Sequence, residues 1–151
     1  MYASGQDTHI ETSDSAIASL HVLVIDDDEN VGAAIRAILA RLKCRTELAS
    51  GGYAGIQAFG LSRFDAVLID LFMTGMSGLD TIAHIRQRST VPIIAMSGFR
   101  LRSSLDRIDY LGTAAKRGAS TCIRKPFSAQ QLINAITSTA GSASSAGAVV
   151  Q

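Results

Sequence analysis

Five side chains that could carry out polar chemistry each follow a short apolar run of the sequence. They are Asp26, Asp27, Asp70, Ser97 and Lys125. Clustered carboxylates repel one another unless a cation compensates their charge, and oxygen ligands without His or Cys suit a hard ion such as Mg²⁺ or Mn²⁺. A carboxylate can also act as a nucleophile towards phosphorus, while a metal and a lysine neutralise the transferring phosphoryl group. Brought together, these side chains would form a complete phosphoryl-acceptor site.

The apolar runs before these side chains predict strands buried on both faces, as in a parallel sheet. The clearest is Phe64–Asp70, in which Val, Leu and Ile in succession end on one carboxylate. Strands are predicted at 21–25, 44–49, 64–70, 91–96 and 119–123, and helices at 30–43, 51–61, 79–88, 101–116 and 128–139. This alternation predicts an α/β fold with a doubly wound parallel sheet. The carboxyl ends of its strands meet at one edge, where such folds bind ligands.

Length and composition favour one folded domain. The chain has 151 residues, of which 47% are hydrophobic and 18% charged, as expected for a globular protein. We predict a flexible N-terminal tail at 1–19, a folded domain at 20–139 and a flexible C-terminal tail at 140–151, where Gly, Ser and Ala dominate.

Charge and cysteine content argue against several classes of protein. The formal net charge of +1 gives no general attraction to nucleic acid or acidic membranes. No segment approaches the ~20 apolar residues of a membrane helix. The acidic N-terminus does not fit a signal peptide, so a cytoplasmic location is expected. Cys44 and Cys122 have no His at ligand spacing, which favours free thiols over a zinc site.

The acidic run Asp26–Glu29 also has a purely structural interpretation. Acids directly before a helix stabilise its N-terminus by capping and through the helix dipole. Capping accounts for one or two of these carboxylates, but hardly for three in a row.

The motifs, taken in order, resemble the receiver domain of two-component response regulators. They are Val24–Glu29, Asp70 with the Met-x-Gly-Met-x-Gly loop, Ile94–Gly98 and Lys125–Phe127. The resemblance covers about residues 20–139. It implies a flavodoxin-like sheet with strand order 2-1-3-4-5, flanked by five helices. It also implies that Asp70 is phosphorylated by a histidine kinase or a phosphotransfer protein.

The same resemblance assigns roles to individual residues. It implies that Asp27, Asp70 and the backbone carbonyl of Phe72 bind Mg²⁺ directly, and that Asp26 contributes through water. It implies that Ser97 and Lys125 contact the phosphoryl group. The resemblance also implies that the bond between Lys125 and Pro126 is cis, although only roughly 5% of X-Pro bonds in general are cis.

The chain departs from the family pattern at two positions close to this site. Thr74 stands where the loop after the acceptor usually has proline, which should loosen that turn. Cys122 stands at the aromatic switch position, three residues before the lysine. The usual coupling of an aromatic rotamer to the phosphoryl site therefore cannot operate in its ordinary form.

Phe72 and Phe99 occupy the two positions that usually tune how long the phosphoryl group survives. Bulky apolar rings there would obstruct an in-line water and offer it no hydrogen bond. We expect slow self-dephosphorylation, with the alternative that both rings pack outward.

The segment from Phe99 to Lys116 is longer than is typical of the family and carries several basic residues. It is interpreted either as a solvated helix face or as a basic surface for a partner.

The sequence predicts a stand-alone receiver: a single-domain response regulator that signals by changing the binding of a protein partner in trans. The expected surface is built from the fourth helix, fifth strand and fifth helix, with a homodimer through it as an alternative. We expect no nucleic acid or membrane partner. We also expect no enzymatic turnover beyond self-catalysed acceptance of the phosphoryl group and its slow hydrolysis. Two alternatives remain: a small phosphatase of the haloacid-dehalogenase type, using Asp26-x-Asp28, and a receiver-like binding module that does not use phosphate.

Overall fold

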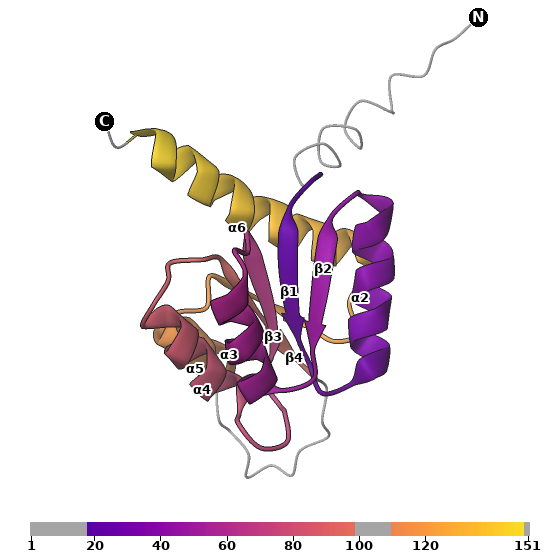
Figure 1. Cartoon of the computed structure of the whole chain (residues 1–151), viewed down its shortest axis with the longest axis vertical. Helices are drawn as coiled ribbons and strands as arrows, with labels where there is room; N and C mark the ends of the chain where they lie inside the picture. Colours follow the sequence, from indigo (N-terminus) through magenta and orange to yellow (C-terminus); the bar gives the residue numbers. More distant parts are fainter. Residues whose placement is uncertain (1–17, 99–109, 150–151) are drawn as a thin grey trace, which may run out of the picture.

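A five-stranded parallel sheet forms the centre of the molecule, with strand order β2-β1-β3-β4-β5 (Figure 1). This computed structural model describes residues 18–98 and 110–149, with residues 141–149 described as backbone alone. The strands are β1 (His21–Ile25), β2 (Arg45–Ala49), β3 (Ala66–Asp70), β4 (Ile93–Ser97) and β5 (Thr121–Arg124). The predicted fold class and strand order are therefore confirmed.

Helices cover both faces of the sheet. They are α2 (Glu29–Arg41), α3 (Gly52–Leu61), α4 (Gly78–Arg86), α5 (Tyr110–Arg117) and α6 (Ala129–Val149). Alternate residues of a strand point to opposite faces. Val22 and Val24 accordingly pack in one core cluster with α2 and α6, while Leu23 and Ile25 pack in another with α3, α4 and α5. Every residue of β3 is buried, as its run of apolar residues predicts.

The helix α3 forms although its sequence contains three glycines. A Cβ atom on Gly55 would overlap the side chain of Ile25 in β1. Glycine therefore lets α3 lie close against the sheet, which offsets its low helix propensity.

The C-terminal helix extends further than the sequence predicts. Regular structure was expected to end at about Thr139, but α6 continues to Val149, so that prediction was wrong. Alanine, the strongest helix former, recurs through this stretch, and no proline interrupts it. The flexibility predicted for 140–151 stays a prediction.

Parts of three predicted segments lie outside the described residues. They are residues 1–17 of the tail at 1–19, residues 101–109 of the helix expected at 101–116, and residues 150–151 of the tail at 140–151. None of the helices in the described ranges combines the length and apolar character that crossing a membrane requires.

Arg86 fastens the end of α4 to the connection that leads into β5. Its guanidinium donates to the carbonyls of Ser89 (3.0 Å), Val91 (2.8 Å) and Gly118 (3.0 Å from Nε and 2.6 Å from Nη2). Burial lowers the pKa of Arg86. Its role is to satisfy backbone carbonyls near the edge of the sheet opposite the acidic residues described next.

Candidate functional site

Strand pairing brings the predicted site residues to the carboxyl edge of the sheet. Asp70 is the last residue of β3 and lies beside Met96 of β4. Ser97 is the last residue of β4, and its carbonyl accepts the N–H of Lys125 at 2.7 Å. Asp26 directly follows β1, whose last residue pairs with Ile69. These residues, at or just after the ends of β1, β3, β4 and β5, thus lie along one edge of the sheet.

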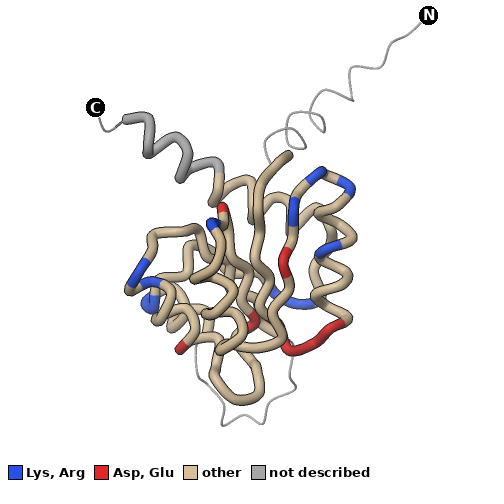
Figure 2. The backbone as a smooth tube through the Cα atoms, in the orientation of Figure 1, with Lys and Arg blue, Asp and Glu red and all other residues tan. Residues whose placement is uncertain are grey.

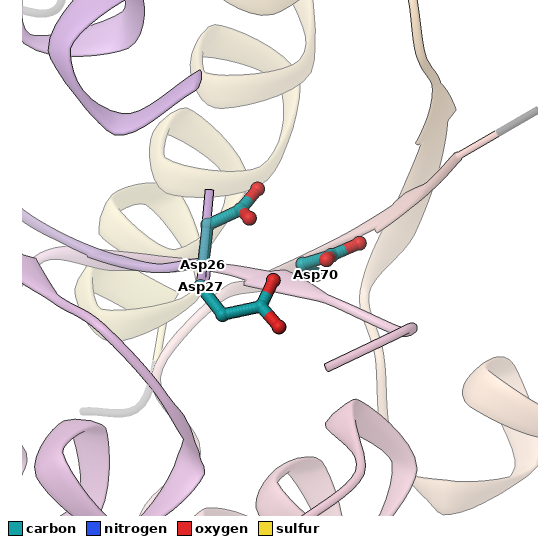
Figure 3. Close-up of side chains that lie close together, drawn as sticks. All are labelled: Asp26, Asp27 and Asp70. Carbon is teal, nitrogen blue, oxygen red and sulfur yellow. The ribbon is translucent and has the colours of Figure 1, made fainter. Parts of the chain in front are cut away.

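The three aspartates form a compact cluster. Asp26, Asp27 and Asp70 each offer a carboxylate oxygen, and these oxygens lie within 4.8 Å of one another. Their carboxyl groups extend to the same side of the strand ends (Figure 3). Asp26 and Asp70 are each only 4% exposed, whereas Asp27 is exposed. An all-oxygen donor set that is open on one side suits a hard divalent cation such as Mg²⁺.

Lys125 supplies the positive charge of the cluster. Its Nζ lies 2.6 Å from Oδ2 of Asp26 and 3.4 Å from Oδ1 of Asp70. The other oxygen of Asp26 accepts the N–H of Asp28 at 2.9 Å. Both oxygens of the Asp26 carboxylate therefore accept a hydrogen bond, and the ammonium of Lys125 bridges Asp26 to Asp70.

The carboxyl group of Asp70 titrates well above its ordinary range. Burial and the negative charge of Asp26 raise its pKa to about 6, against the opposing effects of Lys125 and the N–H of Phe72. That N–H lies 3.4 Å from Oδ1 of Asp70. At neutral pH the group is mostly a carboxylate, as a nucleophile must be.

The loop between β3 and α4 contacts the acidic cluster through Thr74. The N–H and the hydroxyl of Thr74 both donate to Oδ2 of Asp27, at 3.0 Å and 3.2 Å. At the start of α4, a Cβ atom on Gly78 would overlap the carbonyl oxygen of Asp70. The glycine therefore lets the helix approach the acceptor strand. The site prediction included neither contact, although it identified Thr74 as a departure from the family pattern.

Acidic residues gather in the connection between β1 and α2 (Figure 2). Asp28 is the N-cap of α2, and its side chain accepts the N–H of Asn30 at 2.9 Å. The capping interpretation of the acidic run therefore applies to Asp28, whereas Asp26 and Asp27 belong to the cluster.

The remaining predicted positions lie around the cluster. The ring of Phe72 packs edge-on against Tyr110, the first residue of α5, with ring centroids 4.6 Å apart and planes at 74°. Cys122, in β5, is half-buried, and its Sγ atom lies 3.9 Å from the carbonyl oxygen of Leu111 in α5. The bond between Lys125 and Pro126 is cis, as expected. Phe99 lies outside the described residues.

The fold and its edge cluster define a doubly wound α/β protein with a carboxylate site that contains one lysine. A family model of the response regulator receiver domain matches residues 22–137, so the chain belongs to this family. The chain is 34% identical to the transcriptional regulatory protein CseB of Streptomyces avermitilis, over 75% of this chain and 46% of that protein. It is 30% identical to the transcriptional activator protein PfeR of Pseudomonas aeruginosa, over 83% of this chain and 39% of that protein.

Solved structures agree with this assignment. The fold is similar to that of a response regulator receiver domain protein from Clostridium thermocellum, with a TM-score of 0.73, 26% identity, and coverage of 83% of this chain and 97% of that one. The Francisella response regulator 1452 receiver domain shares the fold with a TM-score of 0.72 at 24% identity, over 83% and 99% of the two chains. The chain spans less than half the length of the curated relatives named above.

Proposed function

We propose that the protein is a phosphorylation switch whose phosphoryl acceptor is Asp70. An oxygen of Asp70 attacks the phosphorus of a phosphohistidine on a histidine kinase or phosphotransfer protein. The phosphorus–nitrogen bond breaks, and an aspartyl phosphate forms. The observation that carries the proposal is the position of Asp70, a carboxylate beside two others and 3.4 Å from an ammonium group.

The surrounding residues have complementary roles in this transfer. Lys125 neutralises negative charge on the phosphoryl oxygens, and the hydroxyl of Ser97 donates a hydrogen bond to the group once it has arrived. Asp27 and Asp70, with the carbonyl of Phe72 and with Asp26 through water, would hold Mg²⁺ or Mn²⁺. A bound divalent ion supplies further neutralisation of charge on the transferring group.

The chain turns over no separate substrate in this proposal. Water attacks the phosphorus of the aspartyl phosphate slowly, which releases inorganic phosphate and restores the carboxylate. Phe72 is two residues after the acceptor, and its apolar ring offers this water no hydrogen bond. Phe99 lies outside the described residues, and the proposal gives it the same role. A phosphoryl half-life that is unchanged or longer in Phe72→Asn with Phe99→Glu would contradict their role.

Output follows from a change in the binding of a protein partner in trans, without direct nucleic-acid or membrane binding. The surface involved is that of α5, β5 and α6. The contact between Phe72 and Tyr110 supports this choice, because it joins the acceptor loop to the first residue of α5. A homodimer through this surface is the alternative. Stand-alone organisation and a cytoplasmic location stay predictions, since the curated relatives extend well beyond the matched region.

Intact-protein mass spectrometry tests phosphoryl acceptance. The wild type is incubated with acetyl phosphate, with and without MgCl₂, beside Asp70→Asn and the control Asp80→Asn. Asp80 is an exposed carboxylate on α4, outside the cluster. We expect one added phosphoryl group in the wild type and in Asp80→Asn, dependent on Mg²⁺, and none in Asp70→Asn.

Other outcomes would favour the two alternatives. An adduct that survives in Asp70→Asn and maps to Asp26 or Asp28 would favour the phosphatase. No adduct from acetyl phosphate or from a phosphorylated phosphotransfer protein would favour the phosphate-independent module.

A further inference from the structure

Thr74 contacts the acidic cluster in a way that depends on both its backbone and its side chain. Its N–H lies 3.0 Å, and its hydroxyl oxygen 3.2 Å, from the same atom, Oδ2 of Asp27. The two residues are 47 positions apart in the sequence, so the contact joins the β1 end to the loop after β3. Both residues are exposed.

The two hydrogen bonds make the two oxygens of the Asp27 carboxylate inequivalent, because both end on Oδ2. An ionised carboxylate has about four lone-pair positions, two on each oxygen. Two donors on Oδ2 occupy that oxygen, and Thr74 leaves Oδ1 to another ligand. Asp27 is also the only exposed carboxylate of the described three-aspartate cluster. Its side chain is therefore the one that most needs an external contact to hold it in place.

We propose that Thr74 is a positioning residue for the cation site. It holds Oδ2 of Asp27 so that the remaining oxygen is presented to a divalent ion shared with Asp70. This inference rests on the proposed function, because it takes the aspartates to be the ion's ligands. Hydrogen bonds to ligating carboxylates orient them and sustain metal affinity.

The identity of residue 74 matters because half of the contact comes from the backbone. Serine would keep both donors, and valine would keep the N–H and the branched shape while removing the hydroxyl. Proline has no N–H and no hydroxyl, and so would remove both donors. These three substitutions form a graded series at one position.

The alternative is that Thr74 merely anchors the loop, or that it competes with the ion for Asp27. An anchoring role predicts a lower stability in the absence of metal without a change in metal affinity. Competition predicts tighter binding when the donors are removed. Positioning alone predicts weaker binding in proportion to the donors lost.

The test is the dissociation constant for Mg²⁺, measured with MgCl₂ alone by titration calorimetry. The rise of the thermal midpoint with MgCl₂ concentration, followed by far-UV circular dichroism, gives a second measure. Ionic strength is held constant with NaCl. Thr74→Ser, Thr74→Val and Thr74→Pro are compared with the wild type. Thr90→Val is the matched control. Thr90 is an exposed threonine that precedes β4, at the edge of the sheet opposite the acidic cluster.

We expect Mg²⁺ binding about tenfold weaker in Thr74→Pro, the low end for such contacts because Asp27 is exposed. In Thr74→Val, which keeps the N–H, we expect a smaller loss of about threefold. Thr74→Ser and Thr90→Val should bind as the wild type does. Unchanged or tighter binding in both Thr74→Val and Thr74→Pro, with normal wild-type binding, would overturn the positioning role and leave the cation site intact. No Mg²⁺ binding by the wild type would overturn the cation site and this inference together.

Discussion

Nζ of Lys125 lies closer to Asp26, at 2.6 Å, than to Asp70, at 3.4 Å. The ammonium therefore makes its shorter contact with the buried carboxylate that is not the proposed acceptor. A phosphoryl group on Asp70 would add negative charge beside the same ammonium. In the proposed switch, the ammonium of Lys125 would then move from the carboxylate of Asp26 towards the phosphoryl oxygens on Asp70.

Replacement of Lys125 tests how far this pair supports the fold. Lys125→Met removes the counter-ion of two buried carboxylates, so we expect the free energy of unfolding at pH 7 to fall by roughly 2–3 kcal/mol, below the range for fully buried pairs because Lys125 is partly exposed. Urea denaturation followed by circular dichroism measures the change. Lys43→Met, at an exposed position, should alter stability by less than about 0.5 kcal/mol. Equal effects in the two variants would show that the bridge has no stabilising role.

Asp70 should make stability depend on pH in a defined direction. Its pKa is raised to about 6 in the folded protein, against about 3.9 in an unfolded chain. Between these values the folded state binds more protons, so this group lowers stability as pH rises from about 4 to 6, and its full cost is present above 6.

The variant Asp70→Asn isolates this effect in the metal-free protein. At pH 7 we expect the variant to be more stable than the wild type by on the order of 1–3 kcal/mol, because the amide introduced in the variant is neutral whereas the buried carboxylate of the wild type is charged. The difference should shrink as the pH falls towards 4, where the wild-type group is also neutral. Denaturation in EDTA at several pH values measures it. A difference independent of pH would contradict the raised pKa.

The contact between Phe72 and Tyr110 is suited to a double-mutant cycle. Their edge-on packing joins the acceptor loop to α5, and such aromatic pairs contribute about 0.5–1.5 kcal/mol beyond area burial. We expect a coupling energy in this range from the unfolding free energies of Phe72→Leu, Tyr110→Leu and the double variant. Additive single effects would mean that the two rings are independent neighbours.

The parts of the site that could be predicted from sequence are those fixed by strand ends. Asp26, Asp70 and Lys125 each follow an apolar run, and parallel strands bring their carboxyl ends to one edge. The contact between Thr74 and Asp27 could not be predicted, because it depends on the path of a loop that no periodicity describes. The end of α6 was missed for a different reason, since its Gly and Ser content suggested a flexible tail while alanine sustained the helix.

Gly78 should be essential to the geometry of the acceptor strand. An added Cβ would overlap the carbonyl oxygen of Asp70 and lie 2.6 Å from the Cα atom of Leu71. Both are backbone atoms that cannot rotate away, so α4 or the end of β3 must move. We expect Gly78→Ala to lower the free energy of unfolding by about 1–3 kcal/mol and to reduce phosphoryl acceptance from acetyl phosphate.

Gly60→Ala provides the matched control, because a Cβ at that position in α3 has nothing within 4 Å. Alanine there should be neutral or stabilising by up to about 1 kcal/mol through higher helix propensity, and acceptance should not change. If Gly78→Ala behaves like this control in both measurements, the close approach of α4 to the acceptor does not constrain the site. If it loses acceptance while keeping most of its stability, the position of the Asp70 backbone itself controls the chemistry.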